Sequence, residues 1–159
     1  MSSGPLSFPG AVQATPAIRD HLKAGLQALR RGESNKVFIA DTRRLVGSVD
    51  IDGALKQVAP NDARWDYVVG VSRPSASDVP TFIEFHPANS TSVREIIGKA
   101  IWLKEWLRSD ALPLLELAGG RPRLVWIATG RIAFRRGSKA ERQLAQSGIR
   151  FPEPKVELP

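Results

Sequence analysis

A chain of 159 residues, 42% hydrophobic and 25% charged, is long enough for one domain with a buried core. It has no cysteine, which excludes disulfides and thiolate metal sites and suits a cytoplasmic protein. It also lacks a signal-peptide pattern and any apolar run of roughly 18 residues, so we expect no membrane partner. The net charge of +7 favours a polyanionic partner, DNA or RNA, although a basic protein without such a partner has the same balance.

The first part of the chain is predicted to be an arm followed by a helix. Residues 1–14 are rich in Ser, Gly and Pro, which favours a flexible N-terminal arm. Thr15 and Pro16 then form a typical helix start, with Thr as the N-cap and Pro at the first helical position. Apolar residues follow at helical spacing as far as Gly32, where we expect the helix to end: Ile18, Leu22, Leu26 and Leu29.

Four strands are predicted next, at Lys36–Ala40, Leu45–Ile51, Trp65–Val71 and Thr81–His86. The second strand ends in an acidic pair, Asp50 and Asp52, just before Gly53. Two carboxylates at alternate strand positions could bind a metal. Their place before a glycine makes a turn the favoured interpretation, and a contribution of one of them to a metal site is the alternative.

A long helix, a buried strand and a last helix complete the predicted core. Ser92 and Glu95 form a capping box, and the helix that it opens runs to about Ser109 with one continuous aliphatic stripe. Residues 123–129 are strongly apolar and are expected to form a central strand, buried on both faces. A second capping box, at Ser138, opens the last helix.

This order predicts an α/β (α+β) protein with a mixed central sheet flanked by helices. Sequential strands with short links favour an antiparallel meander, and the strand after the long helix is best placed by a crossover connection. We expect a single domain over residues 15–150. Residues 151–159 contain three prolines and are predicted to form an extended C-terminal tail.

The third and fourth predicted strands carry acidic residues where a buried strand would normally be apolar. Asp66 lies in the third strand, and Glu84 and His86 lie in the fourth. Because Glu84 and His86 are two residues apart, a pleated strand points both to one face. An acid that faces an acid and a third polar group on the neighbouring strand suits a divalent metal. Alternatively, Glu84 and His86 bond each other or the neighbouring strand on a solvated sheet face.

With these residues in this order of elements, the chain resembles the restriction-endonuclease-like superfamily, the PD-(D/E)XK nucleases. The resemblance covers roughly residues 16–130 and implies a core of helix, three-stranded meander, helix and strand. It places Asp66 at the family's Asp, Glu84 at the acid of the triplet, and His86 where the family has lysine. It implies that Asp66 and Glu84 bind Mg²⁺ or Mn²⁺ in a phosphodiesterase that acts on DNA or RNA.

His86 departs from the family pattern, because a histidine is not a fixed cation. It could bind the metal or act as a base, and some members of the family supply the cation from the following helix. Lys104 lies within the aliphatic stripe of that helix and is our candidate for this catalytic role. The alternative for Lys104 is a side chain that reaches solvent at the edge of the stripe. Lys99 lies on the opposite side of the helix, with the two tryptophans.

Basic residues are concentrated near the C-terminus, where we expect them to hold a nucleic-acid backbone. Contacts of this kind give affinity without sequence information. The predicted nucleic-acid-binding residues are Arg131, Arg135, Arg136 and Lys139.

Trp102 and Trp106 are one helical turn apart and lie away from the aliphatic stripe. Three interpretations stay open: burial beneath the first helix or the tail, the interface of a homodimer, and stacking on bases. The sequence thus predicts a metal-dependent nuclease. The alternatives are a non-catalytic nucleic-acid-binding module that has lost the lysine, and an oligomeric protein-interaction module that uses the tryptophan face.

Overall fold

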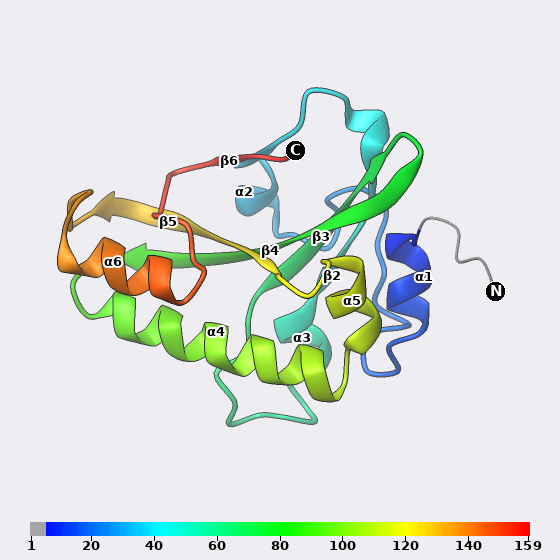
Figure 1. The fold of residues 1–159 in the computed structure, drawn as a ribbon, viewed down its shortest axis with the longest axis horizontal. Coiled ribbons are helices and arrows are strands. Elements are labelled where there is room, and N and C mark those ends of the chain that lie inside the picture. Colours follow the sequence, from blue (N-terminus) through cyan, green and yellow to red (C-terminus); the bar gives the residue numbers. More distant parts are fainter. Residues whose placement is uncertain (1–5) are drawn as a thin grey trace.

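The computed structural model describes residues 6–159, and its core is a four-stranded sheet of order β2-β3-β4-β5 (Figure 1). Strands β2 (Leu45–Asp50), β3 (Tyr67–Arg73) and β4 (Ala76–Ala88) form an antiparallel meander. Strand β5 (Arg123–Ile132) lies parallel to β4, after the crossover helix α4 (Ser92–Ser109). The predicted α/β fold with a mixed sheet is confirmed. The other elements are α1 (Phe8–Gln13), α2 (Arg31–Ser34), β1 (Val37–Phe38), a 3-10 turn (Thr42–Arg44), α3 (Ile51–Leu55), α5 (Leu112–Leu117), α6 (Lys139–Gln146) and β6 (Val156–Glu157).

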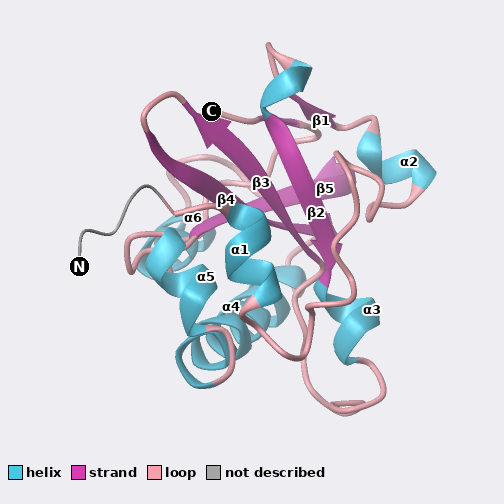
Figure 2. Ribbon diagram, turned by 90° about the vertical axis from the view of Figure 1, so that its right-hand side faces the viewer, coloured by secondary structure: helices cyan, strands magenta, loops and turns pink. Residues whose placement is uncertain are grey.

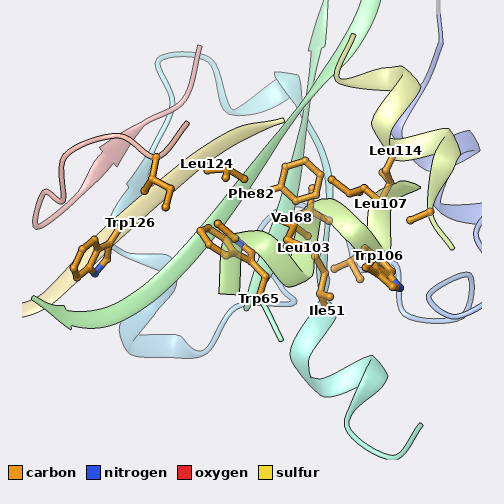
Figure 3. Packing of buried hydrophobic residues seen from close by; sticks show 14 of the residues in the cluster. Ile51, Trp65, Val68, Phe82, Leu103, Trp106, Leu107, Leu114, Leu124 and Trp126 are labelled. Carbon is orange, nitrogen blue, oxygen red and sulfur yellow. The ribbon is translucent and has the colours of Figure 1, made fainter. Parts of the chain in front are cut away.

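Helix α4 covers one face of the sheet, and Figure 2 shows α1 and α5 on the same side. The predicted aliphatic stripe is its buried face, with Val93, Ile96, Ala100, Leu103 and Leu107. These side chains form one hydrophobic cluster with residues of the sheet, among them Val68, Phe82, Leu124 and Trp126 (Figure 3). In the described part of the chain, no helix is both long and apolar enough to cross a membrane.

The other face of the sheet is covered by β1, α2 and the C-terminal tail. Tyr67, Ile83 and Phe85 point to this side and cluster with residues of the tail. The tail is extended, as predicted, and it is paired: β6 lies parallel to β1, with Val37 opposite Val156. The sheet is therefore buried on both faces, and the polar residues in its middle are enclosed.

The predicted helix after Thr15 is wrong, because the segment is bonded to the edge of the sheet instead. The backbone N–H and C=O of Lys23 both bond Ser48 on β2, at 2.9 Å each. Gly25 adopts a φ of +51°, which interrupts a helix at that point. Residues 16–29 form successive turns, and the apolar residues that suggested a helix include two that are buried from those turns, Ile18 and Leu29.

The structure also differs from the flexible arm expected over residues 1–14. Residues 8–13 form α1, which Ser7 caps by accepting a hydrogen bond from Gly10 N at 3.0 Å. The helix docks through Phe8, whose ring is fully buried against Gly70 of β3. A Cβ at Gly70 would lie 2.2 Å from the ring of Phe8, so this docking requires glycine there. Residues 1–5 lie outside the described residues.

We therefore expect Gly70→Ala to destabilise the protein by about 2 kcal/mol, because the Phe8 ring must move from a closely packed site. Urea denaturation measures the change. Gly98→Ala, in α4 with open space around the new methyl group, is the matched control and should be neutral or slightly stabilising. Equal stability of the Gly70→Ala and wild-type proteins would show that α1 does not dock on β3.

Candidate active site

Asp66 and Glu84 lie side by side where the start of β3 pairs with the middle of β4. Asp66 immediately precedes β3, and Glu84 is in the middle of β4 with no solvent exposure. The backbone N–H of Asp66 donates to Glu84 Oε1 at 3.0 Å, and that of Phe85 donates to Asp66 Oδ2 at 2.9 Å. These two bonds fix the carboxyl groups with respect to each other. The structure thus brings together the two predicted metal ligands.

A lysine from α4 completes the cluster, and it is Lys99. Its Nζ lies 2.5 Å from Glu84 Oε2, and its side chain is 23% exposed. The predicted Lys104 is elsewhere: its Nζ donates to the backbone carbonyl of Ser147 at 2.6 Å. A separation of five positions turns the two lysines to different sides of α4, so of the two only Lys99 reaches Glu84.

The charge of the cluster is determined by its burial. Burial, followed by the nearby Asp66 charge, raises the pKa of Glu84 to about 8. Burial likewise raises the pKa of Asp66 to about 6. Burial alone would lower the pKa of Lys99, but the nearby carboxylates, Glu84 first and then Asp66 and Asp52, more than offset this and raise it above its usual value. The positive charge of one lysine thus faces two enclosed carboxyl groups.

His86 is held at the edge of this cluster by two oxygen acceptors. Its Nε2 lies 3.0 Å from Glu95 Oε2 on α4, and its Nδ1 lies 2.9 Å from the carbonyl of Pro87. A neutral imidazole has only one N–H, so it can donate only one of these bonds when Glu95 is ionised. In this arrangement neither nitrogen of His86 is available to a metal.

The second acidic pair has structural roles. Asp50 caps α3, since its Oδ1 accepts from Gly53 N at 2.8 Å. Asp52 pairs with Arg64 at 3.0 Å. The turn predicted before Gly53 is therefore the first turn of a short helix. The sequence pattern does not single out Glu33. Its carboxylate accepts a hydrogen bond at 2.6 Å from the hydroxyl of Tyr67, the residue that follows Asp66 in the chain.

The predicted basic residues lie at the same end of the sheet as His86. Strands β4 and β5 are parallel and both end there, with Ala88 opposite Ile132. Arg131, Arg135 and Lys139 are exposed beyond that end. Arg136 differs from them, because it bonds Glu153 at 2.7 Å and lies 3.6 Å from Glu141.

The two tryptophans of α4 stack on each other. Their ring centroids are 5.8 Å apart with an angle of 7° between the planes. Trp106 is buried in the main cluster, and Trp102 Nε1 donates to Asp62 at 2.9 Å. The pair packs beside α3 and the loop that follows it, and the C-terminal tail lies on the other face of the sheet.

Comparisons of the chain with protein-family models, with curated proteins and with solved structures found no match. The function is therefore inferred from the site itself.

Proposed function

We propose that the chain is a metal-dependent nucleic-acid phosphodiesterase, a nuclease, in which Asp66 and Glu84 bind Mg²⁺ or Mn²⁺ and Lys99 supplies the catalytic cation. The observation that carries the proposal is the contact of Lys99 Nζ with Glu84, which is in turn bonded to Asp66. Two acids and a lysine are the three groups that the resemblance to PD-(D/E)XK nucleases implies. The order of meander, helix and parallel strand supports the same proposal.

The residues at the site fit a small divalent cation. Asp66 and Glu84 offer oxygen ligands, which Mg²⁺ and Mn²⁺ prefer, and a cation would balance the second carboxylate that Lys99 leaves uncompensated. Within residues 6–159 no group of three or more His, Asp and Glu side chains surrounds one point. The protein would thus supply two carboxylates and leave the other positions to water and substrate. When bound, the ion would activate a water and neutralise charge on the phosphate.

Lys99 would act on the phosphate side of the reaction. Its ammonium group is held by Glu84 and is partly exposed, so it can donate to a phosphate oxygen or orient the attacking water. On this proposal the cation would come from α4, which would account for the histidine at the lysine position of the motif. His86, held by Glu95 and Pro87, would then be a positioning residue that ties the end of β4 to the first turn of α4.

The backbone of the nucleic acid would extend over the exposed arginine and lysine beyond the ends of β4 and β5. Arg131, Arg135 and Lys139 lie at the same end of the sheet as His86. Such contacts add affinity that falls with salt and carries no sequence information. Arg136 contributes less, because two carboxylates already neutralise it.

The test is cleavage of plasmid DNA, single-stranded DNA and RNA by the purified protein. We expect cleavage of at least one substrate with Mg²⁺ or Mn²⁺ and none with a chelator. Asp66→Asn, purified in parallel, controls for contaminating nuclease and should be inactive. No cleavage of any substrate by the wild type, or equal cleavage by the variant, would refute the proposal.

A second candidate function is a nucleic-acid-binding module without catalysis. The observation that favours it is the direct contact of Lys99 with Glu84, which satisfies one ligand oxygen within the protein itself. Such a module would bind nucleic acid equally well in Mg²⁺ and in chelator and would cleave nothing. Gel-shift measurements in both conditions, next to the cleavage assay, distinguish the two functions.

A further inference from the structure

A groove of about 740 Å³ lies beside α4, between that helix, α3 and residues 16–17. Its apolar lining includes the stacked indoles of Trp102 and Trp106 and the side chains of Leu55 and Val58. Val58 is 77% exposed. We call this hollow the α4 groove. Leu55 and Trp106 are themselves buried, so the apolar surface that is open to solvent is that of Trp102 and Val58.

The charge of the α4 groove is opposite to that of the whole chain. Its charged lining residues, among those that the structure describes, are Asp62, Glu105 and Asp110, with no Lys, Arg or His. Within residues 6–159 none of these three carboxylates forms an ion pair, whereas the chain as a whole carries a net charge of +7. Asp110 also follows the last residue of α4, where the helix dipole adds partial negative charge.

We propose that the α4 groove binds a segment of a partner protein that carries Arg or Lys next to an apolar residue. The apolar side chain would lie on Val58, and the cation would lie between the carboxylates and the indole of Trp102. Tryptophan is the best aromatic partner for a cation, and nearby carboxylates strengthen the preference. Nucleic acid does not fit, because its phosphates would meet three carboxylates. This inference does not depend on the nuclease proposal.

The test uses three capped peptides as probes: one of alternating Leu and Arg, one of alternating Leu and Glu, and one of alternating Gly and Arg. Binding is followed by NMR through the indole N–H signals of the four tryptophans. We expect the Leu–Arg peptide to shift the Trp102 and Trp106 signals with a Kd below about 1 mM, and to leave those of the fully buried Trp65 and Trp126 in place. The Leu–Glu peptide should cause no shift, and the Gly–Arg peptide should bind more weakly.

Charge variants avoid the risk that a tryptophan variant fails to fold. Glu105→Gln combined with Asp110→Asn should weaken the Leu–Arg peptide about fivefold. Glu116→Gln, an exposed carboxylate on α5 outside the groove, is the matched control and should leave binding unchanged.

Three results would overturn the proposal. The first is the absence of shifts with the Leu–Arg peptide, and the second is equal binding by the double variant. The third is a shift of the same indole signals with protein concentration alone, together with sedimentation as a dimer. That result would assign the groove to a second copy of the chain.

Discussion

Lys99→Met is expected to lower metal-dependent cleavage about 10²- to 10³-fold, the effect of removing one charge-stabilising donor from an active site. Methionine keeps the length and apolar stem of lysine but removes the ammonium group that lies 2.5 Å from Glu84. The fold should survive, because Glu84, whose pKa is already about 8 beside Lys99, stays protonated instead of becoming an unpaired buried charge. Lys104→Met, which removes the bond to the Ser147 carbonyl, is the matched control and should leave cleavage unchanged.

A purely structural role of Lys99 predicts a different result. If the lysine only neutralises Glu84, its removal should let Mg²⁺ bind more tightly while kcat stays at the wild-type level. If it stabilises the transition state, kcat falls while KM and the metal affinity change little. Lys99→Arg, which keeps the charge in a different shape, should recover part of the activity. Full kcat in the Lys99→Met variant would remove Lys99 from the catalytic residues.

The sheet was predictable from the sequence because its strands alternate or are continuously apolar, and the links between the meander strands are short. The structure of the region before β2 was not predictable in this way. Ile18, Leu22, Leu26 and Leu29 have helical spacing, but the backbone bonds between Lys23 and Ser48 outweigh it. Such a pairing joins residues far apart in sequence, and spacing within one segment does not reveal it. The true N-cap, Ser7 ahead of Pro9, lies in a Gly- and Pro-rich stretch that we interpreted as an arm.

At the site, the acidic pair was predictable and the lysine was not. Asp66 and Glu84 were found because acids are unusual in buried strands. The spacing places Lys99 on the same side of α4 as Trp102, three residues later, and so predicts that it faces away from the sheet. Yet Lys99 is also three residues after Ile96 and four before Leu103, both fully buried. It thus lies at the edge of the buried stripe, a position from which a long side chain reaches the sheet.

The metal-free protein is expected to lose several kcal/mol of stability as the pH rises from 5 to 8. Folding raises the pKa of Glu84 to about 8 and that of Asp66 to about 6, from ordinary values near 4. The native state therefore binds more protons than the unfolded chain in this range. The stability that these protons provide is present at low pH and is lost as the pH passes through the two native values. Urea denaturation in chelator at each pH measures it.

The sign of this dependence tests whether the two carboxyl groups are enclosed together. Most carboxyl groups in folded proteins are stabilised as anions and make a protein more stable as the pH rises from acid. Glu84→Gln keeps the acceptor for Asp66 N but cannot ionise, so it should flatten the slope. Glu105→Gln, on the same helix as Lys99 but exposed, should not. A wild-type slope of the opposite sign would mean that Lys99 holds Glu84 as an anion throughout this range.

Added Mg²⁺ should stabilise the protein more at pH 8 than at pH 5, because the ion competes with protons for the same oxygens.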